Sequence, residues 1–149
     1  IIALLIVLVA LVHLIDATLS LLPDIGGKPV SIRAAFALLF RPLVWLIGVP
    51  WPESEAAATL MATKTALNEF VAYLDLAALP EGALSPRSKL IMTYALCGFA
   101  NFGSLGIMIG GMTTMAPERR HDIVALAPRS LISGTLATLM SGAVVGMAG

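Results

Sequence analysis

The most informative segment of the sequence is residues 53–79, which read ESEAAATLMATKTALNEFVAYLDLAAL. Both arms are apolar, but the whole is too polar for an ordinary membrane-spanning helix, because it contains Lys64, Asn68, Glu69 and Asp75. A polar centre between two apolar arms indicates a re-entrant hairpin, in which two half-helices enter a membrane and meet at a tip. Non-helical backbone is tolerated at that depth only where protein or a water-filled cavity surrounds it. We therefore predict such a hairpin with its tip near residues 67–70, and an ordinary amphipathic helix is the alternative.

The composition of the whole chain agrees with a membrane location. Of its 149 residues, 58% are hydrophobic and 12% are charged, and the mean hydropathy is +0.95. Soluble domains are roughly 45–50% apolar and about 25% charged. Nine basic and nine acidic residues give a net charge of zero, which argues against nucleic-acid binding, because neutralising phosphates needs a basic surface. A single cysteine, Cys97, excludes an intrachain disulfide and a multi-cysteine metal site.

Four further helical segments are predicted around the hairpin. Residues 1–22 are mostly apolar and would be about 33 Å long as a helix, which is enough to cross the hydrocarbon core. Residues 31–47 carry two arginines and end near two tryptophans, which favours a helix lying in the membrane interface; Pro42 is expected to interrupt it. Residues 89–115 form a long apolar run. Residues 130–149 form a last span with a face of small residues, namely Ser133, Gly134, Thr135, Ser141 and Gly142.

The run over residues 89–115 is broken near its middle by residues 98–106, which read GFANFGSLG. Gly, Asn and Ser at mid-membrane fit a discontinuous helix whose free backbone groups line a site, although small residues also serve close helix packing. Residues 116–129 are predicted to be a polar connection. The predicted fold class is an all-α integral membrane protein with transmembrane helices, a re-entrant helical hairpin and a discontinuous helix. Because Ile1 lies inside an apolar run, we expect the chain to be the C-terminal part of a larger transporter.

Glu69 is the strongest candidate for a functional residue. A carboxylate at bilayer depth costs roughly 2.5–3.5 kcal/mol, so it needs a partner or a cavity. When ionised, its two oxygens accept hydrogen bonds and suit the two hydroxyls of a sugar diol. The alternative is a carboxylate that Lys64 or the hairpin backbone satisfies. Asn101 and Ser104 are three residues apart, so they share a face of a near-helical segment and can both bond hydroxyls; interhelical hydrogen bonding is their alternative.

Other polar residues support weaker interpretations. His13 and Asp16 suit a proton relay, but a pair that satisfies itself or a neighbouring helix is the favoured interpretation. Lys64 either balances Glu69 or Asp75 or lies at the wet end of the hairpin. The sequence does not decide between these positions.

Four motifs occur in order along the chain: GVPW at residues 48–51, NEFVAY at 68–73, ALCGFAN at 95–101 and APERR at 116–120. Together they resemble the C-terminal domain of the concentrative nucleoside transporters, over essentially the whole chain. NEFVAY and CGFAN are the specific strings. The resemblance implies a cation-coupled nucleoside symporter, driven by Na+ or H+, that takes up nucleosides by alternating access.

The resemblance also implies roles for single residues. Glu69, Asn101 and Ser104 would bind the ribose of the substrate, and Phe99 would pack on the nucleoside, with core packing as the alternative for Phe99. Asn68 is expected to cap the hairpin tip rather than to bind substrate directly.

The same resemblance assigns a place to each segment. Residues 1–22 would be a scaffold helix at a homotrimer interface, and residues 31–47 an interfacial helix. Residues 53–79 would be the second re-entrant hairpin of the family, residues 89–115 the discontinuous helix paired with it, and residues 130–149 the last helix. We expect a multi-pass protein of the plasma membrane, or of the cytoplasmic membrane in a bacterium.

The missing N-terminal part of the transporter would supply the rest of the machinery. By resemblance, the first hairpin and its partner helix read the nucleobase and hold the coupling cation upstream of Ile1. The Na+ or H+ site is therefore expected mostly outside this chain, which is expected to need no other cofactor and to hold no metal site.

Two other function classes compete with a transporter. A structural or interaction membrane protein would use the same polar residues only for helix packing and assembly. An enzyme is disfavoured, because neither histidine lies near Cys97 in the sequence to act as its base, and no HExxH, P-loop or GxGxxG motif is present.

Overall fold

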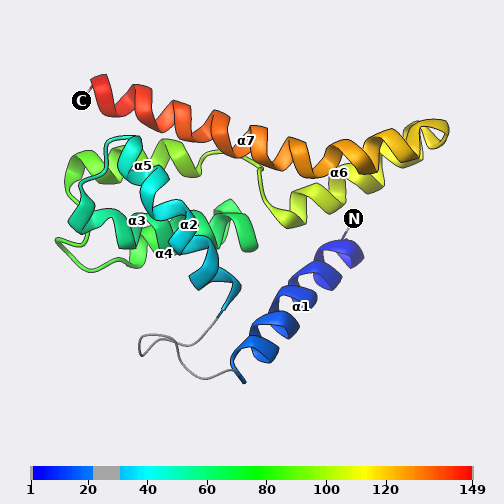
Figure 1. Ribbon diagram of the computed structural model, residues 1–149, viewed down its shortest axis with the longest axis horizontal. Helices are drawn as coiled ribbons and strands as arrows, with labels where there is room; N and C mark the ends of the chain where they lie inside the picture. The colour runs from blue at the N-terminus through cyan, green and yellow to red at the C-terminus, as the bar shows by residue number, and fades with distance from the viewer. Residues whose placement is uncertain (1, 22–30, 149) are drawn as a thin grey trace.

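The computed structural model describes residues 2–21 and 31–148, and every regular element in these ranges is helical. Figure 1 shows them in order along the chain: α1 (Ile2–Leu19), α2 (Ile32–Leu46), η1 (Trp51–Glu53), α3 (Ser54–Ala66), α4 (Glu69–Ala78), α5 (Pro86–Leu96), α6 (Phe102–Met115), η2 (Pro117–Arg119) and α7 (Arg120–Ala148). The prediction of an all-α protein is confirmed for the described residues. Residues 1, 22 and 149, at the edges of predicted segments, lie outside them.

Helix α3 is the centre of the core. Nearly all of its residues from Ala57 to Ala66 are buried, and it packs against α2, α4 and α5. On α2, Phe40 and Val44 are buried on the side that contacts it. Helix α2 continues through Pro42, which we expected to interrupt it. A proline removes only one backbone hydrogen bond and kinks a helix, and the packing of α2 on α3 holds the two halves together.

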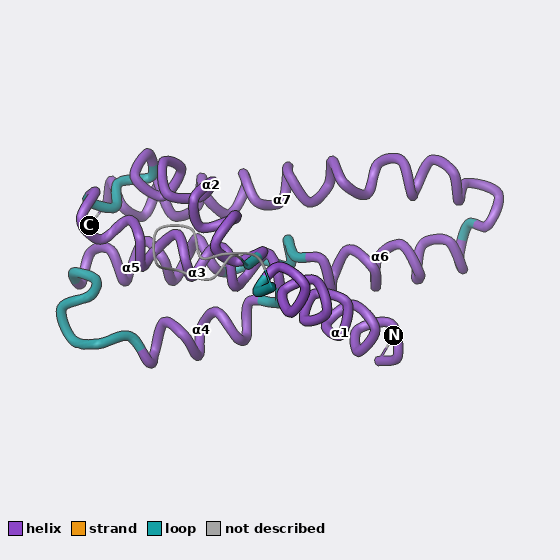
Figure 2. Tube along the Cα trace, turned by 60° about the horizontal axis from the view of Figure 1, so that its bottom comes forward, coloured by secondary structure: helices purple, strands orange, loops and turns teal. Residues whose placement is uncertain are grey.

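The segment over 53–79 folds as two helices, α3 and α4, that are joined at Leu67 and Asn68. Figure 2 shows this turn near the middle of the molecule, beside the non-helical segment that separates α5 from α6. Asn68 has extended backbone angles and its side chain accepts a hydrogen bond from the Val71 amide at 2.9 Å, so it is the N-cap of α4.

Helix α7 packs along both α5 and α6, which lie one after the other beside it (Figure 1). The interruption between α5 and α6 covers residues 97–101, so it is shorter than the predicted 98–106. The reason is local: Asn101 caps the new helix, and the Gly and Ser residues after it are simply helical.

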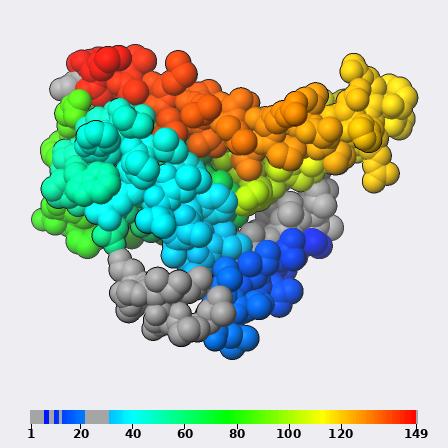
Figure 3. Space-filling view, viewed as in Figure 1, coloured from blue at the N-terminus to red at the C-terminus, as the bar shows by residue number. Residues whose placement is uncertain are grey.

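Helix α7 also begins earlier than predicted. Residues 120–129, which we expected to form a polar connection, make its first three turns, and Pro128 lies inside the helix. The tip at which α6 ends and α7 begins extends beyond the other helices (Figure 3), and most side chains at this end of α7 are exposed. Polar residues indicate that a segment is exposed to solvent, but an exposed segment can be helical. The polar composition of residues 120–129 therefore led to a wrong prediction of where the helix begins.

The contact between α5 and α7 depends on small residues. Added Cβ atoms would lie 3.1 Å from the Ala95 Cβ if placed on Gly142 and 2.8 Å from the Ile91 Cδ1 if placed on Gly146. Of the predicted small-residue face on α7, Gly142 and Thr135 are buried, whereas Ser133 and Ser141 are exposed. The close approach of α5 to α7 therefore uses only part of that face.

We expect Gly98→Ala to destabilise the protein by about 1–3 kcal/mol, the usual cost of overpacking. The new Cβ would lie 2.4 Å from the Thr138 Cγ2, far inside van der Waals contact. Thr138→Ser removes that methyl group and keeps the hydroxyl, so the double variant should recover most of the lost stability. Gly111→Ala is the control, because nothing lies within 4 Å of its added Cβ.

Thermal melting of the full-length protein in detergent measures these differences. If Gly98→Ala melts like Gly111→Ala, or if Thr138→Ser fails to rescue it, the packing of the helix interruption against α7 is not as described.

By length and composition, one helical stretch within the described residues is able to cross a membrane. It is Pro117–Ala148, with 32 residues. The apolar helix Phe102–Met115 is shorter.

Candidate functional site

Two helix N-termini face each other at the middle of the molecule, and each is capped by an asparagine. Asn68 caps α4, and Asn101 caps α6 with its Oδ1, which accepts a hydrogen bond from the Ser104 amide at 2.7 Å. Backbone N–H groups and the positive end of the helix dipole make such termini favourable for negative charge. Glu69, the first residue of α4, lies at one of them.

Glu69 and Asn101 are in direct contact. The Asn101 Nδ2 donates to the Glu69 Oε2 at 3.0 Å, although the two residues are 32 positions apart in the sequence. Asn101 is only 1% exposed, and its two side-chain ends are committed to Glu69 and to the α6 cap, so the amide has one orientation. The structure therefore joins Glu69 to Asn101, and Asn101 lines one cavity together with Ser104 and Phe99, which Glu69 itself does not line.

Phe99 and Ser104 line a cavity of about 400 Å³ that Asn101 and Thr138 also line, between the helix interruption, α6 and α7. Phe99 is 77% exposed. Phe99 is therefore not part of the core that the described residues form. Ser104 lines this cavity, and its backbone amide is the group that Asn101 caps.

The structure decides the position of Lys64, which the sequence left open. Its side chain is fully buried, and its Nζ donates to the Ala95 carbonyl at 3.0 Å and to the Thr138 Oγ1 at 2.8 Å. It is not at a wet end of the hairpin. The Glu69 carboxylate attracts its charge, as one of the predicted alternatives has it, although no direct ion pair joins the two in the described part of the chain. The hydrogen-bond partners of Lys64 are 31 and 74 positions away, which no local sequence pattern signals.

Of the two residues considered for a proton relay, His13 and Asp16, Asp16 makes a structural contact. The Asp16 Oδ1 accepts a hydrogen bond from the Ile32 amide at 2.7 Å, at the start of α2. This agrees with the favoured interpretation, in which Asp16 satisfies a neighbouring helix. His13 is exposed.

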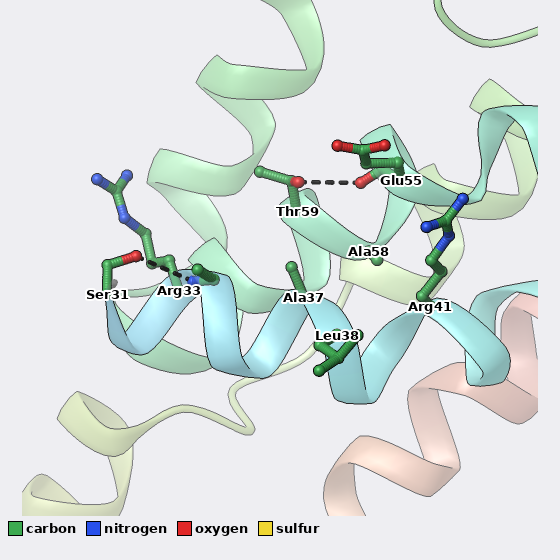
Figure 4. Close-up of a pocket in the computed structure, with 9 residues that line it drawn as sticks. Ser31, Arg33, Ala37, Leu38, Arg41, Glu55, Ala58 and Thr59 are labelled. Carbon is green, nitrogen blue, oxygen red and sulfur yellow. Dashed lines mark hydrogen bonds between the residues drawn. The ribbon is translucent and has the colours of Figure 1, made fainter. Parts of the chain in front are cut away.

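A second cavity, of about 600 Å³, lies between α2 and α3 (Figure 4). Arg33 and Arg41 stand at its two ends, and Arg41 also stacks over Trp51 and donates to the Ser54 hydroxyl at 3.1 Å. None of the predicted site residues lines this cavity. It is therefore separate from the contact between Glu69 and Asn101.

Comparisons with known proteins identify the family. The family described as Na+ dependent nucleoside transporter C-terminus matches residues 1–146. The chain is 43% identical to an uncharacterized transporter of Haemophilus influenzae, over 97% of the chain and 36% of the relative. It is 40% identical to human solute carrier family 28 member 3 and 38% identical to mouse sodium/nucleoside cotransporter 1, each over 96% of the chain.

Solved structures show the same relationship. The structure of CNTnw in an inward-facing substrate-bound state is 40% identical and has a TM-score of 0.77, covering 97% of this chain and 34% of that one. A CNTnw variant in an intermediate state has a TM-score of 0.89 at 38% identity, covering 99% of this chain and 37% of that one.

The chain spans about a third or less of the length of these relatives: 36% of the bacterial transporter, 23% of the human protein and 24% of the mouse protein. The relatives are transporters and not enzymes. The chain therefore belongs to the Na+ dependent nucleoside transporter family, whose C-terminal part it matches.

Proposed function

We propose that this chain is the C-terminal part of a cation-coupled nucleoside symporter and that it supplies the ribose-binding residues. Glu69, Asn101 and Ser104 bind the ribose hydroxyls, and Phe99 packs on the nucleoside. The observation that carries the proposal is the 3.0 Å contact between the Glu69 carboxylate and the Asn101 amide, at two facing helix N-termini. The relationship to nucleoside transporters supports the choice of ligand.

The chemistry of these groups suits a sugar diol. The second oxygen of Glu69 can accept a hydrogen bond from one hydroxyl, and the second N–H of the Asn101 amide can donate to another. The Ser104 hydroxyl can donate or accept beside them. A site that bonds hydroxyls discriminates strongly against a substrate that lacks one, because buried polar groups are then left unpaired.

The mechanism that we propose is alternating access in a multi-pass membrane protein. The α3–α4 hairpin is re-entrant, and it moves together with the α5–α6 interruption around the bound ribose. The upstream part of the transporter reads the nucleobase and holds the coupling cation, Na+ or H+. The full-length protein assembles as a homotrimer in the plasma membrane, or in the cytoplasmic membrane of a bacterium.

Calorimetry on the full-length protein tests the site directly. Uridine and adenosine should bind to the wild type, and their 2′- and 3′-deoxy analogues should bind at least about tenfold more weakly, since one lost hydrogen bond to a charged group costs about 1.5–3 kcal/mol. Folded protein that binds the deoxy analogues as tightly as the parent nucleosides would exclude a ribose site here.

One observation favours a second function, a structural or interaction membrane protein. The bond between Glu69 and Asn101 also joins α4 to the start of α6, so it contributes to helix packing. Under this alternative, Glu69→Gln should impair assembly of the full-length protein. Under the ribose proposal, it should impair nucleoside binding. Size-exclusion chromatography of the variant beside its binding isotherm distinguishes the two.

A further inference from the structure

The end of α5 leaves four backbone carbonyls without helical partners, those of residues 93–96, as at the end of any α-helix. Two of them are satisfied inside the interruption: the Cys97 amide donates to the Tyr94 carbonyl at 3.2 Å, and the Gly98 amide donates to the Leu96 carbonyl at 2.9 Å. The other two, on Thr93 and Ala95, receive hydrogen bonds from side chains of the hairpin.

Each arm of the hairpin supplies one of these side chains. From α3, the Lys64 Nζ donates to the Ala95 carbonyl at 3.0 Å, and from α4, the Tyr73 hydroxyl donates to the Thr93 carbonyl at 2.6 Å. Tyr73 is four residues after Glu69, so the two side chains lie on the same face of α4. The face that carries the carboxylate is therefore also tied to the end of α5.

Lys64 depends on the interruption for its place in the core. Its side chain is fully buried, and a buried ammonium must be paired or hydrogen-bonded to be tolerated. The C-terminal end of a helix offers free carbonyls and the negative end of the dipole, both of which favour a cation. The Thr138 hydroxyl, from α7, is a second acceptor at 2.8 Å. One ammonium thus joins the hairpin, the end of α5 and α7.

We propose that Lys64 and Tyr73 are positioning residues, which fix the two arms of the hairpin to the end of α5 so that Glu69 meets Asn101. The contact between Glu69 and Asn101 lies just beyond these two bonds, at the turn of the hairpin and the start of α6. Neither residue needs to touch the substrate. The inference rests on the proposed function only for the identity of the substrate. The attachment of the hairpin to the end of α5, which we call the clamp, rests on the three side-chain contacts between the hairpin and residues 93–101.

The test uses Lys64→Met and Tyr73→Phe in the full-length protein, with uridine and 3′-deoxyuridine as ligands. Met keeps an unbranched apolar stem and loses the ammonium, and Phe loses only the hydroxyl. We expect Lys64→Met to raise the Kd for uridine at least tenfold and to shrink the preference for uridine over 3′-deoxyuridine, because the hydroxyl-binding groups are no longer held together. Tyr73→Phe should change both quantities in the same direction by a few-fold.

Two matched controls lie on α5 itself. Lys89→Met and Tyr94→Phe remove the same chemical groups from exposed positions, so both should keep the wild-type Kd and preference. A purely structural role for Lys64 and Tyr73 would lower the amount of folded protein and leave the Kd and the preference of that protein unchanged. That result overturns the proposal. If Lys64→Met yields no folded protein, the test rests on Tyr73→Phe. A wild-type Kd and a wild-type preference for uridine over 3′-deoxyuridine in that variant would overturn the proposal.

Hydrogen exchange separates the clamp from the choice of substrate. Without any nucleoside, the amides of residues 97–105 should exchange faster in Tyr73→Phe and Lys64→Met than in the two control variants. Faster exchange in a protein that binds no nucleoside would support the clamp and contradict the proposed function. Exchange equal to that of the controls would overturn the clamp, whatever the protein binds.

Discussion

Glu69→Gln is expected to lower nucleoside uptake by the full-length protein by about 10- to 100-fold. Glutamine has the same size but only one acceptor oxygen, which the Asn101 Nδ2 occupies at the observed 3.0 Å contact. The ribose hydroxyl would then meet an NH₂ group in place of a carboxylate oxygen. A hydrogen bond to a charged group contributes about 1.5–3 kcal/mol, and each 1.4 kcal/mol is tenfold in affinity.

Radiolabelled uridine uptake, normalised to the amount of assembled protein, measures this effect. Asp75→Asn is the matched control, since it neutralises a carboxylate on the same helix at a position away from the interhelical contact; its uptake should stay near the wild-type rate. Wild-type uptake by Glu69→Gln would remove Glu69 from the site. A variant that fails to assemble would instead favour the structural alternative.

Asn101→Ala and Asn101→Ser should both lose uptake by about tenfold or more, and the alanine variant should lose more stability than the serine variant, because both lose the bond to Glu69 but only alanine also loses the cap. The Asn101 side chain has two separable tasks: its Oδ1 caps α6, and its Nδ2 reaches Glu69. Serine is also a good N-cap, so it retains the cap that is worth about 1 kcal/mol. It has no amide to donate to the carboxylate or to the ribose.

Uptake and melting temperature, measured on the same preparations, separate the two tasks. Asn68→Ser is the control, because Asn68 caps α4 in the same way: its Oδ1 accepts a hydrogen bond from the Val71 amide. This variant should keep both its uptake and its melting temperature. If Asn101→Ser transports like the wild type, Asn101 is a helix cap and no ligand of the substrate.

Much of the fold is readable from local sequence. The polar residues within 53–79 predict a helix pair with a turn near residues 67–70, and the structure has that turn at Leu67 and Asn68. Asn68 was predicted to be a cap, since a side chain that bonds the backbone three residues on is a local feature. Asn101 caps α6 in the same local way, but the sequence analysis considered it only as a binding or packing residue. The start of α7 was predicted wrongly, because exposed polar residues are compatible with helix as well as with loop.

The candidate site is only partly a local property. The types of residue at Glu69, Asn101 and Ser104 suggest hydroxyl chemistry, and their motifs suggest the family. The contact between Glu69 and Asn101 depends on how the hairpin packs against α5 and α6, which involves contacts across 32 positions. Phe99 illustrates the limit, because an aromatic residue in an apolar run is compatible with the core, and the structure leaves it 77% exposed.

The sequence alone therefore established the helical class, the apolar character, the Asn68 cap and the motifs of the family. Tertiary structure decided the partners of buried polar groups, above all those of Lys64. Backbone hydrogen bonds in helices join residues four apart, so the sequence encodes them locally. A buried ammonium takes any acceptor that packing brings within reach. Its acceptors on Ala95 and Thr138 come within reach because α5 packs against both α3 and α7.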